Sequence, residues 1–401
     1  MYLVENRLTR LVENLKQSPS LPLRLELWNG RRFDLSPHPT VTIAVPRPSA
    51  LRYLISPDLN KLGEAFVEGH IKVEGSIEEV FRVAESLARN AAGRARLGLG
   101  RFFRHSRKKD RKAIEYHYDV SNDFYRLFLD RNMVYSCGYY RSESDSLDTA
   151  QEQKLDHILA KLMVRPGDRF LDIGSGWGAL IIRAAKKFGA RSTGITLSQN
   201  QFDYARHRIQ AEGLADRCEV RLQDYRDVPE HGSFDKIASV GMFEHVGLGN
   251  LETYFRKINA LLRDGGLVLN HGITATDADS RQVGKGAGEF IDRYVFPHGE
   301  LPHISLVLEK MSRASLEVAD IESLRRHYAR TCHEWGLRLE ASRDKAIAAA
   351  GDKRYRIWQI YLAGCAHGFA HGWMNIYQVL ACRINQPGAL PMTRDYMYPS
   401  R

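Results

Sequence analysis

A short apolar segment that runs into a glycine-rich turn constrains the fold of this chain more than any other feature. Residues 169–173 read Arg-Phe-Leu-Asp-Ile, residues 174–178 read Gly-Ser-Gly-Trp-Gly, and a helical pattern follows over 179–188. In a doubly wound α/β sheet, a strand, a glycine-rich turn and a helix in this order hold nucleotide-like ligands at the carboxyl end of the strand. We therefore expect an α/β sheet with a ligand site at this turn.

The spacing of the glycines narrows the class of ligand. The run Asp-x-Gly-x-Gly-x-Gly begins at Asp172, so it lacks the Gly-x-Gly-x-x-Gly spacing of dinucleotide-binding proteins, and no phosphate-binding lysine follows it. A ligand without phosphate, with an amino-acid end and an adenosine end, suits this turn better than NAD or ATP. A tight turn with a purely structural role is the alternative that the motif alone leaves open.

Further patterns support the α/β interpretation. Strands are predicted over 191–197, 219–222, 234–240 and 267–270, and Ser198 is a plausible N-cap of a helix after the first of these. Strands separated by helices form a sheet with right-handed crossovers. We expect the functional residues at or just after the strand ends, where such sheets place their sites.

A second helical pattern lies toward the C-terminus. Apolar residues recur at intervals of three or four over 354–382, which predicts one long helix that carries Cys365. Gly364, Gly368 and Gly372 lie four residues apart on this predicted helix. Because glycine costs about 1 kcal/mol per helix position relative to alanine, three in register suggest a use. Close helix packing and the binding of an apolar chain both remain open.

Length and composition bound the organisation of the chain. With 401 residues, two domains are expected. Residues 1–95 form a first unit, with strands over 23–28 and 41–45, a hairpin turn at Asn29-Gly30 and a helix over 76–90. The stretch over 91–112 is rich in alanine, glycine and arginine, which predicts a linker that we place at residues 96–112. Residues 113–401 form the second unit, which carries the glycine-rich turn.

Composition also bears on the compartment. No apolar run approaches the ~18 residues of a membrane-spanning helix. The first seven residues lack the charged-then-apolar pattern of a secretion signal. The five cysteines form no CxxC pair, and their spacing suggests neither a disulfide framework nor a metal site. We therefore expect a cytoplasmic protein.

Positive charge is concentrated in the predicted linker. The formal net charge is +10, and seven lysines and arginines fall within residues 101–112, with Phe102 and Phe103 among them. Such a segment attracts anionic lipid or nucleic acid. We expect a peripheral contact with an anionic membrane and no nucleic-acid partner. A solvated linker is the alternative.

Several motifs, in order, carry a family resemblance. Residues 171–178 (Leu-Asp-Ile-Gly-Ser-Gly-Trp-Gly), 194–198 (Gly-Ile-Thr-Leu-Ser), 241–247 (Gly-Met-Phe-Glu-His-Val-Gly) and 294–297 (Tyr-Val-Phe-Pro) resemble the cyclopropane-fatty-acyl-phospholipid synthase family, which includes the mycolic acid cyclopropane synthases. The resemblance extends from about Tyr116 to Arg383, and residues 1–95 resemble the small N-terminal domain of the full-length bacterial phospholipid enzymes. It implies a class I S-adenosylmethionine-dependent methyltransferase, with a Rossmann-like doubly wound sheet and a small α+β N-terminal domain.

The resemblance implies a set of residues that bind S-adenosylmethionine. They are a Tyr-Ser pair, the glycine turn with its aspartate, the segment after the second strand and a residue beyond the third strand. In this sequence these positions are Tyr135, Ser136, Asp172, Gly174, Gly176, Gly178, Thr196, Leu197, Gln201 and Tyr225. Tyr225 stands where the mycolic acid enzymes often have a Trp-Glu pair near the adenine.

The resemblance also implies the reaction and its base. Methyl transfer to an alkene leaves a carbocation, and a base must then remove a proton without capturing the cation. The family implies bound bicarbonate as this base, in a cage that is formed here by Cys137, Glu244, His271, Ile273 and Tyr328. Cys365 also matches a family site position, and we expect it to line the site rather than to act as a nucleophile. His245 is the competitor for the role of Glu244.

Each role has a structural alternative. Without a catalytic role, Glu244 would be a glutamate in a surface loop, and His271 would be a core histidine whose ring nitrogens are hydrogen-bonded. Tyr328 would be a tyrosine that packs on a helix. A methyltransferase acting on nucleic acid or a small molecule would explain the donor motif and the charge, but it leaves these three residues unexplained. A non-catalytic lipid-binding protein is a third class, against which the intact donor motif argues.

The resemblance leaves the product open, because related enzymes form a cyclopropane ring or add a methyl or methylene branch that can need a reductase partner. We expect transfer to the double bond of an unsaturated acyl chain on a membrane phospholipid, with a cyclopropane product. The expected location is the cytoplasm, with peripheral attachment to the inner membrane. Because the family often dimerises, a homodimer is a further expectation.

Overall fold

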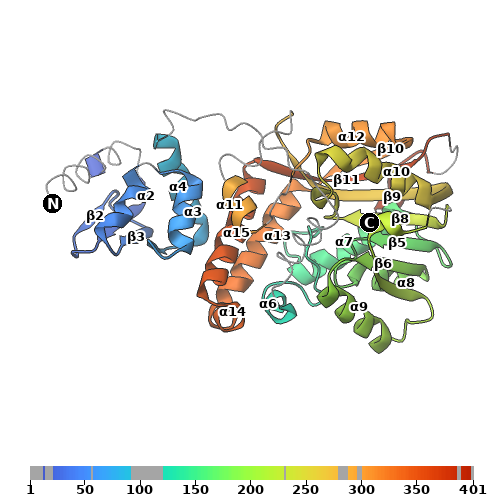
Figure 1. Ribbon diagram of the computed structural model, residues 1–401, viewed down its shortest axis with the longest axis horizontal. Coiled ribbons are helices and arrows are strands. Elements are labelled where there is room, and N and C mark those ends of the chain that lie inside the picture. The colour runs from blue at the N-terminus through green and yellow to red at the C-terminus, as the bar shows by residue number, and fades with distance from the viewer. Residues whose placement is uncertain are drawn as a thin grey trace.

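The computed structural model describes residues 12–13, 21–55, 57–91, 121–229, 232–278, 288–295, 300–385 and 390–398. A small N-terminal unit lies at one end of the molecule, a large sheet lies at the other, and helices from the C-terminal part of the chain lie between them (Figure 1). The expected basic linker over 96–112 lies outside the described residues. Within the described ranges, no helix is long and apolar enough to cross a membrane.

The N-terminal unit packs helices on a four-stranded sheet of order β2-β1-β3-β4. Its elements are β1 (Leu23–Leu27), β2 (Arg32–Asp34), β3 (Val41–Val45), α2 (Arg52–Ile55), α3 (Leu59–Val67), β4 (Lys72–Glu74) and α4 (Ile77–Ala91). Buried and half-buried residues alternate along β1 and β3, because one face of the sheet packs on the core. The two predicted strands, the helix and the turn at Gly30 (φ +79°) are confirmed.

The larger unit is built on a seven-stranded sheet of order β10-β11-β9-β8-β5-β6-β7. Its strands are β5 (Arg169–Ile173), β6 (Arg191–Thr196), β7 (Cys218–Leu222), β8 (Phe234–Val240), β9 (Leu262–Ala275), β10 (Leu316–Ser323) and β11 (Met374–Arg383). The strands from β5 to β9 pair in parallel, whereas β11 runs antiparallel to both of its neighbours. The predicted doubly wound α/β fold is therefore confirmed.

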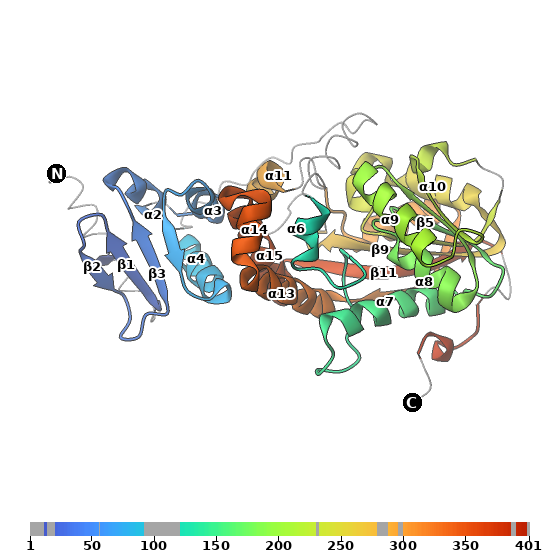
Figure 2. The same ribbon diagram turned by 90° about the horizontal axis from the view of Figure 1, so that it is seen from below.

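Helices cover both faces of this sheet. The helices of this unit are α6 (Asn122–Arg126), α7 (Leu147–Lys161), α8 (Ala179–Phe188), α9 (Gln199–Ala211), α10 (Leu251–Leu261), α11 (Gly288–Tyr294), α12 (Ile304–Arg313), α13 (Arg325–Ala341), α14 (Arg343–Ala350) and α15 (Asp352–Ala370). Of these, α7, α8 and α9 pack on one face of the sheet, and α10 and α12 pack on the other. Successive residues of β5 pack to opposite sides: Phe170 joins a core cluster with α7 and α8, and Leu171 joins one with α10 and α12. The helices α13, α14 and α15 stand between the sheet and the N-terminal unit (Figure 2).

The long helix predicted over 354–382 is wrong in its second half, because residues 374–383 form β11. The chain turns at Gly372, which has a φ of +71°. β11 lies between β9 and β10, and its residues 378–382 are all buried, so this half of the strand lacks the alternation of a half-buried strand. The spacing of Ile376 and Leu380 therefore continues the helical period by coincidence. The three glycines do not share one helix face, since the last lies in the turn.

Candidate active site

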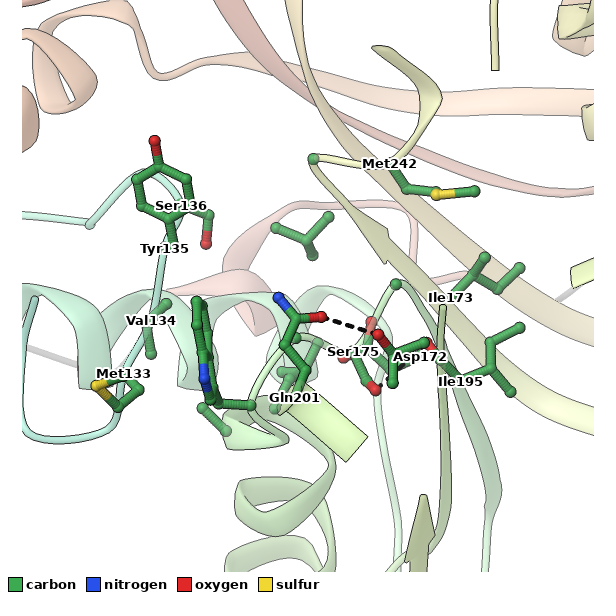
Figure 3. A pocket seen from close by; sticks show the side chains of 18 of the residues that line it. Met133, Val134, Tyr135, Ser136, Asp172, Ile173, Ser175, Ile195, Gln201 and Met242 are labelled. Carbon is green, nitrogen blue, oxygen red and sulfur yellow. Dashed lines mark hydrogen bonds between the residues drawn. The ribbon is translucent and has the colours of Figure 1, made fainter. Parts of the chain in front are cut away.

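A cavity of about 970 Å³, mouth included, lies at the carboxyl ends of β5, β6 and β8, where a doubly wound sheet places its ligands. Its lining comes from these strand ends, from α7 and from the segment that precedes α7. Figure 3 shows Tyr135 and Ser136 on one side of the cavity and Asp172 and Met242 on the other. The fold thus brings segments that are distant in the sequence to one place.

The glycine-rich turn leaves room for a ligand because of its backbone conformation. Gly174 and Gly176 have φ angles of +84° and +55°, which residues with side chains rarely adopt. A Cβ at Gly176 would meet no atom within 4 Å, so the space beside it is open. Gly178 has another role. A Cβ there would lie 3.0 Å from the Cβ of Ala205, so this glycine allows α8 and α9 to pack closely.

Most of the predicted donor residues lie at this cavity. The lining includes Tyr135, Ser136, Asp172, Gly174, Gly176, Thr196, Leu197 and Gln201. Gly178 and Tyr225 are not among the described lining residues. The Tyr225 ring packs edge-on against Tyr254 with 5.1 Å between ring centroids, and Gln223 lines the cavity instead. The contact of Tyr225 with the donor stays a prediction that this geometry does not support.

Two buried residues of opposite charge face the cavity. Asp172 and Lys154 are only 3% and 1% exposed. Burial raises the pKa of Asp172 to about 7, against the effect of Lys154, and burial lowers the pKa of Lys154 to about 8. Lys154 Nζ donates to Ser136 Oγ at 2.8 Å, and Asp172 Oδ1 has no hydrogen-bond partner among the described residues. A ligand that carries both an ammonium and a carboxylate would compensate both groups.

No sequence motif marks Lys154 as a site residue. A signal does exist in α7, where Gln151, Lys154, His157 and Lys161 recur every three or four residues and are all buried. Buried lysines are rare unless they are paired, and Lys161 Nζ lies 3.1 Å from Asp320. A polar stripe on a helix usually indicates the solvent face, so only the tertiary structure shows that this stripe points inward.

Glu244 lies in the turn after β8 and is held against β9. Its Oε1 accepts a hydrogen bond from the backbone N–H of Ile273 at 2.7 Å, and its Oε2 has no partner among the described residues. Burial raises the pKa of Glu244 to about 7, although the Ile273 N–H opposes this shift. His245 lines the donor cavity instead. The surface-loop alternative for Glu244 is therefore wrong, since the side chain is buried.

His271 lies inside β9, which continues past the predicted strand over 267–270 to Ala275. Its ring is fully buried, and the Gln378 amide nitrogen lies 3.2 Å from Nδ1. An amide nitrogen can only donate, so Nδ1 accepts and the neutral ring carries its hydrogen on Nε2. Nε2 has no partner in the described part of the chain. Because burial lowers the pKa of His271, the ring presents a neutral N–H donor near pH 7.

The other predicted site residues share one apolar cluster. Its buried members include Cys137, Tyr328 and Cys365, and Ile273 packs against it. Burial raises the pKa values of the Cys137 thiol and the Tyr328 hydroxyl well above their usual ranges, so both stay protonated. Tyr135, which lines the donor cavity, packs against the same cluster. The structure therefore places this cluster directly beside the donor cavity.

The sheet order, the reversed strand β11 and the cavity at the glycine-rich turn define a class I methyltransferase. A family model described as mycolic acid cyclopropane synthetase matches residues 105–379. The chain belongs to this family of S-adenosylmethionine-dependent methyltransferases. A second model, described as a domain of unknown function, matches residues 11–95.

Relatives match one or both units. A probable fatty acid methyltransferase of Pseudomonas putida is 50% identical over 95% of this chain and 98% of its own length. The tuberculostearic acid methyltransferase UfaA1 of Mycobacterium tuberculosis is 33% identical over 96% of this chain and 92% of its own length. The solved mycolic acid cyclopropane synthase CmaA1, complexed with SAH and CTAB, is 34% identical, has a TM-score of 0.64, and covers 68% of this chain and 97% of its own.

Proposed function

We propose that this enzyme transfers the methyl group of S-adenosylmethionine to the double bond of an unsaturated acyl chain on a membrane phospholipid, and that proton loss then closes a cyclopropane ring. The observation that carries the proposal is the donor cavity beside an apolar cluster that contains Tyr328 and Cys365. An alkene offers no polar group to bind, so its site must be apolar. The relative from Pseudomonas putida that matches both units is called a probable fatty acid methyltransferase, which supports an acyl substrate.

The cavity suits the donor's charges. When bound, S-adenosylmethionine supplies a methyl group on a positively charged sulfur. Asp172 would accept from the donor's ammonium, and Lys154 would pair with its carboxylate, because each is buried with its charge only partly compensated. Tyr135 lies between the cavity and the apolar cluster, so its ring would flank the sulfonium.

The apolar cluster must tolerate a carbocation. The alkene's electrons form a bond to the methyl carbon while the bond from that carbon to sulfur breaks. A proton lost from the added methyl then leaves a cyclopropane, S-adenosylhomocysteine and H⁺. Burial keeps Cys137 and Tyr328 protonated, so neither is the strong nucleophile that would capture the cation. The face of the Tyr328 ring would stabilise the positive charge through its quadrupole.

Glu244 and His271 fit a small anion that accepts this proton. Glu244 is hydrogen-bonded to the backbone of Ile273, which lies two residues after His271 on β9. Glu244 Oε2 and His271 Nε2 are both buried without partners among the described residues. A carboxyl with a pKa of about 7 and a neutral Nε2–H can both donate to an anion. Bicarbonate, which the family resemblance implies, would supply a weakly nucleophilic base there.

A branched product is the second candidate. The relative UfaA1, which matches 96% of this chain, is called a tuberculostearic acid methyltransferase, and the relative from Pseudomonas putida is also called a methyltransferase rather than a cyclopropane synthase. Proton loss after a hydride shift along the chain would give a methylene branch. A saturated methyl branch would need a further hydride and proton, and hence an external reductant.

Lipid labelling tests the proposal. Purified enzyme is incubated with methyl-¹³C S-adenosylmethionine and with vesicles of dioleoylphosphatidylglycerol, free oleate or an oleoyl thioester. We expect the phospholipid chains to gain one CH₂ that resists mild hydrogenation, whereas a methylene branch is hydrogenated and a methyl branch carries two more hydrogens. Label in oleate or the thioester alone would refute the phospholipid substrate. Absence of label from every lipid, with S-adenosylhomocysteine binding intact, would refute the proposed reaction.

The proposed base has its own test. Glu244→Gln should lower turnover far more than the affinity for S-adenosylhomocysteine, because only proton loss depends on this side chain. Rigorous removal of carbonate should slow the wild-type enzyme, and added bicarbonate should restore its rate. An unchanged rate after carbonate removal would exclude bicarbonate as the base.

A further inference from the structure

We infer that the N-terminal unit and the methyltransferase unit together enclose a chamber for the methyl-terminal end of the acyl chain. This chamber limits how far the chain can extend beyond its double bond. The inference rests on the proposed function and deepens it. It also assigns a role to the N-terminal unit, which matches a domain of unknown function.

The chamber is a cavity between the two units with an empty volume of about 1180 Å³, its opening to solvent included. The elements β3, α3 and α4 of the N-terminal unit form one wall, and α11, α15 and the start of β11 form the other (Figure 2). Among the described lining residues, none carries a charge and Gln359 is the only amide. Because each unit supplies one wall, the chamber exists only while the two units are docked.

Glycines hold the two units close along this chamber. A Cβ at Gly364 of α15 would lie 2.9 Å from the Phe81 ring of α4, and a Cβ at Gly63 of α3 would lie 3.0 Å from the Phe290 ring of α11. All four residues line the chamber. Gly364 therefore serves both uses that its position suggested, since it allows close packing of two helices and forms part of an apolar wall.

Polar contacts accompany the apolar wall. Glu85 of α4 lies 3.1 Å from His367 of α15, and Glu68, next to α3, lies 2.8 Å from Lys353 of α15. An apolar centre with polar groups around it is typical of an interface between separately folded units. The two units therefore dock through specific contacts and enclose the chamber.

The chamber and the proposed reaction site share side chains. Cys365 lines the chamber and belongs to the apolar cluster that contains Tyr328. Tyr361 also lines the chamber and packs against that cluster. Tyr135, which lines the donor cavity, packs against the same cluster. An acyl chain whose double bond lies at the cluster would enter the chamber by displacing the side chains of Cys365 and Tyr361, which border both.

The lining selects the methyl end of the chain over its head-group end. A phosphate or carboxylate in the chamber would lose its hydration without a cation among the described lining residues to pair with it. A segment of CH₂ groups that ends in CH₃ needs no polar partner. Burial of each CH₂ favours binding by about fourfold, so the chamber can discriminate between chains that differ by a few carbons.

A bulky side chain in the α4 wall tests the inference. Ala84 lines the chamber, and Ser86, two residues along the same helix, is not among the described lining residues. The substrates are phospholipids with a cis double bond at one fixed distance from the ester and with three lengths of chain beyond it. Ala84→Phe should lower kcat/KM for the longest chain by about 15-fold, as expected if two CH₂ groups are excluded. The shortest chain should be nearly unaffected, and Ser86→Phe should behave as the wild type with all three.

A binding readout supports the kinetics. A phospholipid with a diazirine at the methyl end of its chain should crosslink the wild type on α4 or α15, and peptide mapping locates the crosslink. An equal effect of Ala84→Phe on all chain lengths, no effect, or crosslinks elsewhere in the wild type would overturn the inference. If Ala84→Phe fails to fold, the wild-type crosslink decides. If the wild type methylates no acyl chain at all, the proposed function fails instead.

Discussion

Replacement of Lys154 by methionine tests how the cavity holds the donor. Lys154 Nζ lies 2.8 Å from Ser136 Oγ and shares the cavity with Asp172. Methionine preserves the apolar stem of the side chain and removes its charge. We expect the fold to persist, because Asp172, whose pKa is about 7, can take up a proton when its buried partner is lost.

The loss should fall on the amino-acid end of the ligand. A hydrogen bond to a charged group contributes about 1.5–3 kcal/mol, so the Kd of S-adenosylhomocysteine should rise by about 10- to 150-fold. 5′-Methylthioadenosine lacks the amino-acid end and should bind the variant and the wild type alike. Wild-type affinity for S-adenosylhomocysteine should also weaken above pH 8, where Lys154 loses its proton, and Lys154→Met should lack this part of the change.

Isothermal titration calorimetry with both ligands at pH 7 measures the effect, and circular dichroism checks the fold. Lys187→Met is the control, because Lys187 pairs with Asp156 at the protein surface. Equal weakening of both ligands would indicate a general distortion of the cavity. Undiminished affinity for S-adenosylhomocysteine would place its carboxylate elsewhere. Either result would refute the assignment of Lys154.

Two further substitutions test the site. Glu244→Gln should remove a loss of stability that depends on pH. Because burial raises the pKa of Glu244 from 4.5 to about 7, the free energy of unfolding falls by about 3 kcal/mol as pH rises from below 4.5 to above 7. Urea unfolding should therefore show the variant gaining stability relative to the wild type between pH 5 and pH 8, and a parallel pH dependence would contradict the buried carboxyl. Gly176→Val should abolish S-adenosylhomocysteine binding in calorimetry, because it puts a branched side chain into the open space beside a residue with a φ of +55°. Full affinity in a folded variant would place the donor elsewhere.

The sequence by itself determined the features that depend on contiguous residues. The strand, turn and helix from residue 169 to residue 188 were predictable because their hydrophobic period and their glycines are local signals. The doubly wound α/β sheet followed from the alternation of strands with helices, whereas the order of the strands came from the structure. The same turn favoured a ligand without phosphate, because its glycines let the backbone approach a ligand, and the resemblance carried by the ordered motifs implied S-adenosylmethionine as the donor.

Only the tertiary structure decided which distant residues meet. Lys154 reaches Ser136 because α7 turns its polar stripe inward, and Glu244 reaches the Ile273 N–H across neighbouring strands. The helical period was misleading over β11, because residues 378–382 are all buried and this part of the strand shows no alternation. The chamber between α4 and α15 could not be predicted either, since its walls come from units that are far apart in the chain. Contacts of this kind depend on how the elements dock, and no local pattern of residues encodes that geometry.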